Sequence, residues 1–191
     1  GARVRASTRC EGGGSVTFPR YLDGIYTNTR YVAERLAVAN EDGAAEATFP
    51  GDVVMLDLRN SREVAVFPVI PAARVVERDS ITIDDLPHTF HTSKGTCERI
   101  VAWYADVRSR WPDATVLLFC HAGCRRSAAA AYTVLRVFYG VGHDDAVRRV
   151  QTRLADGTTD TFTPDEWQIE DASVWCDARL NTHGGASVEQ A

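Results

Sequence analysis

Short apolar runs alternate with amphipathic stretches along this chain, and the pattern predicts both strands and helices. Val53 to Leu58 and Thr115 to Phe119 are continuous apolar runs of the length typical of buried strands. Apolar residues at helical spacing predict helices over 100–111, 127–139, 143–154 and 163–180. Strands that alternate with helices indicate an α/β fold: a single domain with a central, mostly parallel sheet flanked by helices.

The segments around the first strand predict shorter elements. Thr29 to Val38 is expected to form a short helix, because Val32, Ala33 and Leu36 fall on one side of a helical projection. Phe18 to Tyr26 is expected to be extended. A further strand is predicted at 73–76, and loops are predicted at 40–50 and 81–93.

The ends of the chain have the composition of flexible segments. Residues 1–17 are rich in glycine and serine, and residues 181–191 are expected to form a disordered tail, which leaves a domain over 18–180. The chain begins at Gly1 rather than Met, which is typical of a trimmed chain.

Composition excludes several classes of protein. The 191 residues are 45% hydrophobic and 25% charged, as in ordinary globular domains. The sequence contains no apolar run of the ~18 residues that a transmembrane helix needs, and no signal-peptide pattern. Its 5 cysteines are odd in number and irregularly spaced, which argues against a secreted disulfide framework and favours an intracellular, cytoplasmic location.

The net charge of −5 is unevenly distributed. The stretch from Cys120 to Arg153 contains 6 arginines and 2 aspartates, so it carries a net charge of +4 and the remainder of the chain carries −9. A basic stretch in an acidic chain favours a small anionic ligand over nucleic acid. No oligomeric state follows from the sequence.

One stretch, Cys120 to Ser127, joins a predicted strand to a predicted helix through a short loop that contains Gly123. Such a loop directs backbone N–H groups and the positive end of a helix toward one spot, which binds anions. Helix N-termini also favour the reactive thiolate form of a cysteine. Arg126 offers a planar fork that binds phosphate through two hydrogen bonds. The stretch therefore predicts a nucleophile beside an oxyanion site.

The same stretch resembles the C-x5-R-[ST] signature of cysteine-dependent protein tyrosine and dual-specificity phosphatases, with Cys120, Gly123, Arg126 and Ser127 in register. The sequence departs from the family pattern at Phe119, where histidine is usual, and at Ala128, where glycine is usual. The resemblance implies a dual-specificity phosphatase fold, Cys120 as nucleophile, Arg126 as phosphate clamp, and no metal or other cofactor. It further implies that the phosphoryl group is bound by loop residues His121, Ala122, Gly123, Cys124, Arg125 and Ser127.

The family also has a general acid on a loop some thirty-odd residues before the cysteine. Asp85, 35 residues upstream, is the better match, and Asp84 is the second candidate. Asp113, in a Trp-Pro-Asp tripeptide like the one that names the acid loop of tyrosine phosphatases, lies before the strand that ends at Cys120. Six strand residues at ~3.3 Å each would place Asp113 about 20 Å away, so we interpret it as a turn residue.

Three functions remain open from the sequence. A phosphatase would act on phosphoproteins (phosphorylated on Tyr, Ser or Thr) or on a phosphoinositide, the latter favoured by the added positive charge of His121 and Arg125. Asp57-Leu-Arg59 followed by Glu63 is also similar to rhodanese-like domains, whose cysteine transfers sulfur or reduces arsenate. The third is a phospho-binding module without turnover.

Other candidate residues have simpler interpretations. His88 and His91 lack the further ligands of a metal site and are expected to be solvated loop residues. Cys124 either forms a protective disulfide with oxidised Cys120 or is a small loop residue. Asp57, Arg59 and Glu63 are expected to be structural, with an ion pair at the end of a buried strand.

Overall fold

The computed structural model describes residues 20–21, 29–66, 68–83, 95–123, 125–151 and 166–183. Within these residues the strands are β1 (Arg20–Tyr21), β2 (Arg30–Ala33), β3 (Leu36–Ala39), β4 (Val53–Asp57), β5 (Val75–Ser80) and β6 (Thr115–Phe119). The helices are α1 (Glu41–Glu46), α2 (Ser61–Val66), α4 (Thr96–Arg110), α5 (Arg126–Phe138), α6 (His143–Val150) and α7 (Glu166–His183).

The described strands form one sheet in the order β1-β2-β3-β6-β4-β5. β2 pairs antiparallel with β1 and β3, whereas β3, β6, β4 and β5 pair in parallel. The domain is therefore α/β with a mixed, mostly parallel sheet flanked by helices, as the sequence predicts.

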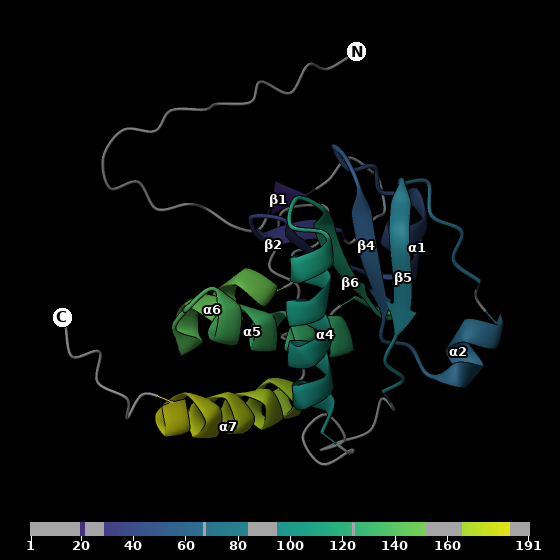
Figure 1. Cartoon of the computed structure of the whole chain (residues 1–191). Coiled ribbons are helices and arrows are strands. Elements are labelled where there is room, and N and C mark those ends of the chain that lie inside the picture. The colour runs from purple at the N-terminus through teal and green to yellow at the C-terminus, as the bar shows by residue number, and fades with distance from the viewer. Residues whose placement is uncertain are drawn as a thin grey trace.

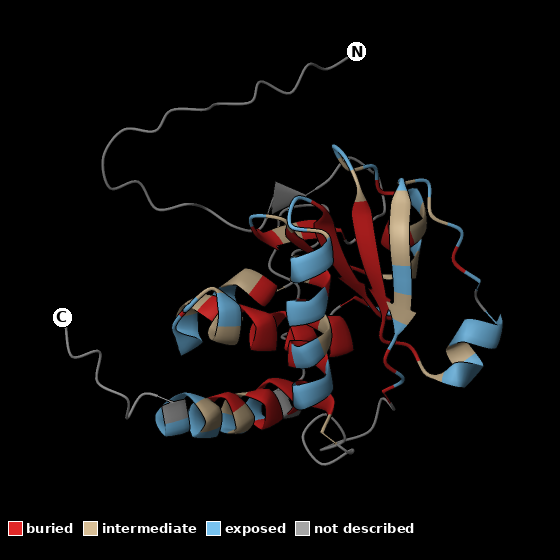
Figure 2. Ribbon diagram, in the orientation of Figure 1, coloured by how far each residue is buried: buried red, intermediate tan, exposed pale blue. Residues whose placement is uncertain are grey.

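The two faces of the sheet have separate cores. In β6, Val116 and Leu118 join the larger core, whereas Leu117 and Phe119 face the smaller core on the other side. The larger core lies beneath α4, α5, α6 and α7, and the smaller core packs against α1 (Figure 1). The alanines of α5 are fully buried, because small side chains let the helix approach the sheet closely (Figure 2).

The helix expected over Thr29 to Val38 is wrong. The segment is a β-hairpin of β2 and β3, and it turns at Arg35, whose φ is 57°. Val32 and Leu36 are both fully buried because the two strands place them on the same face of the sheet. Two buried residues four positions apart are typical of a helix, but here a tight turn between two strands produces the same spacing.

Other boundaries also differ from the sequence-based prediction. The expected loop at 40–50 contains α1, which Asn40 caps by accepting a hydrogen bond from the Gly43 N–H at 2.7 Å. The short helix α2 was not predicted. β5 begins at Val75 and extends to Ser80 rather than ending at 76. β4, β6 and α5 lie where the apolar pattern predicts them. α4 begins at Thr96 rather than at 100, and α6 ends at Val150 rather than at 154. α7 continues to His183, so the first residues of the expected disordered tail are helical.

Candidate active site

Cys120 directly follows β6 and is held at the start of the loop. Its N–H donates to the Ala39 carbonyl of β3 at 3.4 Å, and the residue is only 1% exposed. Its Sγ lies 3.3 Å from the Oγ of Ser127, in the first turn of α5. Parallel pairing with β3 and β4 thus places the thiol beyond the carboxyl ends of the strands, where ligands bind in open α/β sheets.

Gly123 is the point where the loop comes closest to the rest of the domain. Its φ of 74° is in the left-handed region, and a Cβ there would lie 2.5 Å from the backbone nitrogen of Asn40. Only glycine satisfies both conditions without a shift of the backbone. The small residue that the sequence shows at this point is therefore required by the packing.

Arg126 is buried at the start of α5, with 2% of its side chain exposed. Its Nη1 and Nη2 donate to the two carboxylate oxygens of Glu63 at 2.6 and 2.7 Å. Nη1 also donates to the carbonyls of Leu58 and Ile83, at 3.3 and 3.2 Å. The end of the guanidinium is thus fixed in one orientation beside the loop.

Glu63 belongs to α2 and completes a reciprocal cap with Asn60. The Asn60 N–H donates to Glu63 Oε2, and the Glu63 N–H donates to Asn60 Oδ1, both at 2.9 Å. Burial raises the pKa of the Glu63 carboxyl, but the bonds from Arg126 and Asn60 and the charges of Arg126 and His121 outweigh it. The net pKa of Glu63 is lowered, so it is a carboxylate at neutral pH.

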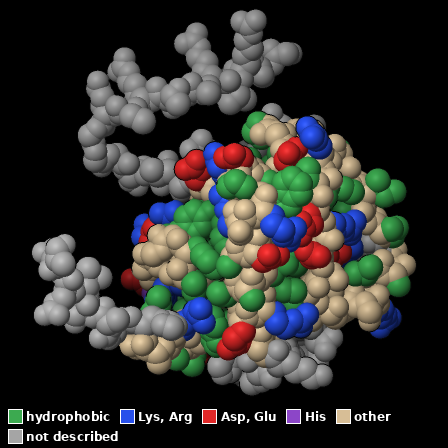
Figure 3. All heavy atoms as spheres, viewed as in Figure 1, with side chains coloured by type: hydrophobic (Ala, Val, Ile, Leu, Met, Phe, Trp, Pro, Cys, Tyr) green, Lys and Arg blue, Asp and Glu red, His purple; other side chains and the backbone are tan. Residues whose placement is uncertain are grey.

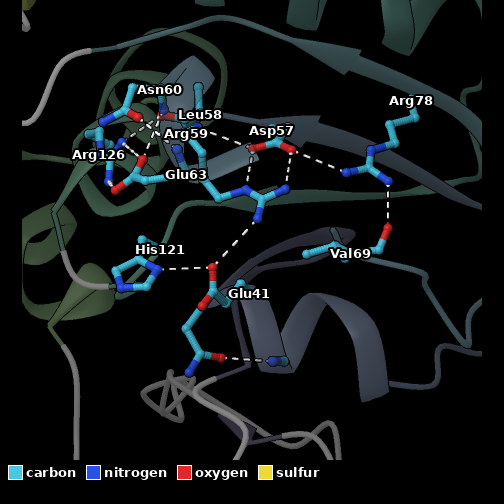
Figure 4. A network of polar contacts seen from close by, with 12 residues as sticks. Glu41, Asp57, Leu58, Arg59, Asn60, Glu63, Val69, Arg78, His121 and Arg126 are labelled. Carbon is cyan, nitrogen blue, oxygen red and sulfur yellow. Dashed lines mark hydrogen bonds and ion pairs between the residues drawn. The ribbon is translucent and has the colours of Figure 1, made fainter. Parts of the chain in front are cut away.

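A second group of charged side chains connects His121 in the loop to Asp57 and Arg78 in the sheet (Figure 4). Arg59, whose side chain is fully buried, donates from Nε and Nη2 to the two oxygens of Asp57 at 2.9 and 2.8 Å. Arg78 also contacts Asp57, at 3.1 Å. Glu41 lies 3.5 Å from Arg59 and 2.9 Å from Nδ1 of His121, so a series of polar contacts connects the edge strand β5 to the loop.

This network refines two expectations from the sequence. The predicted ion pair at the end of β4 exists between Asp57 and Arg59, but Glu63 instead contacts Arg126. The loop is also less basic than its local sequence indicates, because the fold brings Glu41 and Glu63 against it. Sequence reasoning missed the contacts of both glutamates with the loop. For Glu63, the Asn60-x-x-Glu63 capping pattern was an available signal of a helix start.

Several predicted residues lie outside the described residues: Asp84, Asp85, His88, His91 and Cys124. Ile83 is the last described residue before the expected acid loop, and its carbonyl accepts a hydrogen bond from Arg126 at 3.2 Å. The chain is therefore anchored next to Arg126 at a point two residues before Asp85. Of the other loop residues, His121 and Ala122 are exposed and Arg125 is half-buried.

Asp113 lies in the turn between α4 and β6, as predicted. Its carboxylate is 88% exposed and 2.7 Å from Arg35, at the opposite end of β6 from Cys120. A cavity of about 450 Å³ lies at this same distant end, lined by Glu34, Arg35, Tyr104, Arg108, Phe138 and Tyr139. Its main polar groups are already bonded: Arg35 to Asp113, Arg108 to the Ala114 carbonyl, and Tyr104 to Tyr139.

The two other described cysteines differ from Cys120 in their surroundings. Cys97 in α4 and Cys176 in α7 are buried in the larger core. Burial raises the pKa of each thiol to about 12, so neither forms a thiolate at neutral pH.

Across the described ranges, no group of His, Cys, Asp and Glu side chains is arranged to hold a metal ion. No described helix is both long enough and apolar enough to cross a membrane.

No family model matches the chain, and no curated protein matches it in sequence. Solved structures do match it. Human DUSP28 aligns with a TM-score of 0.58 and 15% identity, over 80% of this chain and 95% of that one. A mouse protein described as a dual-specificity phosphatase, complexed with zinc tungstate, aligns with a TM-score of 0.57 and 18% identity, over 90% and 96%.

TpbA from P. aeruginosa in complex with pTyr aligns with a TM-score of 0.52 and 16% identity, over 90% of this chain and 99% of that one. At this level of identity the likeness establishes the fold. The chain has the fold of the dual-specificity and tyrosine phosphatases.

Proposed function

We propose that this protein is a cysteine-dependent phosphatase that hydrolyses phosphomonoesters through a cysteinyl-phosphate intermediate. The observation that supports the proposal best is the junction of β6 and α5. There the Cys120 thiol lies 3.3 Å from the Ser127 hydroxyl, and Arg126, next in sequence to Ser127, is fixed by Glu63. A nucleophile, a hydrogen-bond donor and a fixed cation at one helix start suit an attack on phosphorus.

In the proposed reaction the Cys120 thiolate attacks phosphorus and forms a thiophosphate bond while the bond to the leaving oxygen breaks. Glu63 binds Nη1 and Nη2 and so fixes the guanidinium of Arg126 beside the loop, and in the proposed reaction this guanidinium binds two phosphoryl oxygens. Backbone N–H groups of His121 to Arg125 bind the remaining oxygens. Ser127 donates a hydrogen bond to the thiolate and helps it to leave in the second step.

The leaving oxygen needs a proton, and we propose Asp85 as its donor, with Asp84 as the second candidate. The hydrogen bond from Arg126 to the Ile83 carbonyl supports this assignment, because it anchors the segment before Asp85 beside the clamp. In the second step Asp85 accepts a proton from water, which hydrolyses the cysteinyl-phosphate and releases inorganic phosphate.

The proposed substrates are phosphorylated proteins or phosphoinositides. The complex of TpbA with pTyr favours a phosphotyrosyl group as the first substrate to test, because this chain shares that fold. The fold does not favour the sulfurtransferase alternative, and an intracellular location stays a prediction from the cysteine pattern.

The deciding experiment measures phosphate release from an aryl phosphate by the wild type, Cys120→Ser and Asp85→Asn. We expect turnover by the wild type. The turnover rate should fall by about 10⁴-fold or more in Cys120→Ser and by about 10²- to 10⁴-fold in Asp85→Asn. Full turnover by Cys120→Ser would exclude the mechanism. Thiocyanate formation from thiosulfate without phosphate release would indicate the sulfurtransferase. Binding of phosphotyrosine with no turnover by the wild type would indicate the non-catalytic module.

A further inference from the structure

The loop after β6 rests on the corner between β3 and α1, residues Ala39 to Glu41. The Cys120 N–H donates to the Ala39 carbonyl at 3.4 Å, and the Glu41 N–H donates to the His121 carbonyl, also at 3.4 Å. Gly123 packs against the backbone of Asn40. Corner and loop therefore touch at three successive points, and all three involve the backbone.

The contact between Glu41 and the His121 carbonyl fixes the orientation of one peptide group. In a trans peptide the C=O and the following N–H point in opposite directions. Because the His121 carbonyl points toward the first turn of α1, the Ala122 N–H points away from α1. A loop that binds an oxyanion requires this arrangement, with carbonyls turned outward and N–H groups turned toward the anion.

The side chain of Glu41 also contacts His121, in addition to the backbone hydrogen bond. One carboxylate oxygen, Oε2, lies 2.9 Å from Nδ1 of His121 and 3.5 Å from Nη1 of Arg59. Arg59 is itself bound through two hydrogen bonds to Asp57 at the end of β4. The imidazole is thus connected to the sheet through a buried ion pair, and Figure 4 shows Glu41 between His121 and Arg59.

We propose that Glu41 is a positioning residue of the phosphate-binding loop. Its N–H orients the peptide between His121 and Ala122, and its carboxylate holds the His121 side chain, so that the loop is set for an oxyanion before one binds. Glu41 acts through His121 and touches no reacting atom. The inference rests on the proposed function, because it assigns the loop to phosphoryl binding.

Two substitutions separate the roles of the carboxylate and of the N–H. Glu41→Ala removes the carboxylate alone, whereas Glu41→Pro removes both the carboxylate and the N–H. Proline suits this position, because Glu41 is the first residue of α1, and helices accept proline there. Asn40, with φ −81° and ψ 179°, already has the extended backbone that a residue before proline adopts. Asp42→Ala is the matched control, since Asp42 is exposed in the same turn and carries the same charge.

The test is the dissociation constant of inorganic tungstate, measured by calorimetry, together with KM for an aryl phosphate. We expect tungstate to bind about tenfold more weakly to Glu41→Ala, and about tenfold more weakly again to Glu41→Pro, while Asp42→Ala matches the wild type. KM should rise in parallel. A purely structural role would lower the melting temperature and the binding stoichiometry without changing the dissociation constant.

Equal tungstate affinity of Glu41→Pro and Glu41→Ala would overturn the role of the N–H. A change below twofold in Glu41→Ala would overturn the role of the carboxylate, and this result can be read even where Glu41→Pro fails to fold. If the wild type binds tungstate but releases no phosphate, the proposed function fails, while the affinity series still supports the role of Glu41. If the wild type does not bind tungstate at all, both proposals fail.

Discussion

The two ends of β6 have similar chemistry in very different environments. At the carboxyl end, Arg59 and Arg126 pair with carboxylates, and their side chains are 0% and 2% exposed. At the amino end, Arg35 and Arg110 also pair with carboxylates, but they are 40% and 43% exposed. In Figure 3, acidic and basic side chains are interspersed on the face in view rather than separated by sign.

The difference in burial changes what each ion pair does. Exposed pairs contribute about 0–1 kcal/mol, because water and salt screen them. Removal of one partner of a buried pair costs about 3–5 kcal/mol, because the other charge stays buried without compensation. A buried arginine is thus a costly feature, and two buried arginines, Arg59 and Arg126, lie at the end of β6 that leads into Cys120. Burial, rather than the presence of a motif, distinguishes the end of the sheet where we place the chemistry.

Among the substitutions that test the contrast between the two ends of β6, Arg126→Lys is expected to have the largest effect. Lysine keeps the positive charge but loses the planar fork, so it cannot bind Glu63 and a phosphoryl group at the same time. We expect kcat/KM for an aryl phosphate to fall about 10³-fold. Arg35→Lys, at the amino end, is the control and should retain wild-type kinetics. Comparable losses in the two variants would show that the two ends do not differ as proposed.

The sequence predicts much of the frame of this site but not its charge balance. β6, the loop and α5 are contiguous, so the apolar run, Gly123 and the alanines were enough to predict the strand, the loop and the helix. The contacts of Glu41 and Glu63 with the loop depend on tertiary structure, because each glutamate comes from a different segment. The β2–β3 hairpin was missed for a local reason, since its turn repeats helical spacing.

The next effect in size is expected from Glu63→Gln. Glutamine accepts one hydrogen bond from Arg126 but leaves the guanidinium charge without its carboxylate. We expect a loss of about 2–3 kcal/mol in the free energy of unfolding, measured with urea, and about a tenfold loss in kcat/KM. Glu77→Gln provides the control, because Glu77 pairs with the exposed Arg110 at the other end of β6. A larger loss of stability in the control would reverse the comparison.

The same pair predicts a dependence of stability on pH. The pKa of Glu63 in the folded protein is lower than its ordinary value of 4.5, so its contribution is present above pH 4.5 and is lost as the pH falls through the folded pKa. Asp57 should contribute in the same way. Burial raises its pKa, but the hydrogen bonds and charge of Arg59 and the hydrogen bond from Arg78 outweigh burial, so the pKa is lower than its ordinary value of 3.8. Its contribution to stability is therefore lost as the pH falls below 3.8 and through the folded pKa. The difference in unfolding free energy between wild type and Glu63→Gln should therefore shrink below pH 4.5. A difference that grows with acidification would contradict the lowered pKa.

The smallest effect is expected at Asp113, although its Trp-Pro-Asp setting resembles a known acid loop. Its carboxylate is 88% exposed and pairs only with the surface residue Arg35 among the contacts described. We expect Asp113→Asn to change kcat/KM less than about twofold and the unfolding free energy by less than about 1 kcal/mol, and this small change should vanish in high salt. Asp85→Asn, assayed in parallel, should lose its activity across the same pH range. If Asp113→Asn removed the basic limb of the pH–rate profile while Asp85→Asn retained it, the general acid would lie at the amino end of β6. The difference in burial between the ion pairs at the two ends of β6 would then no longer identify the active site.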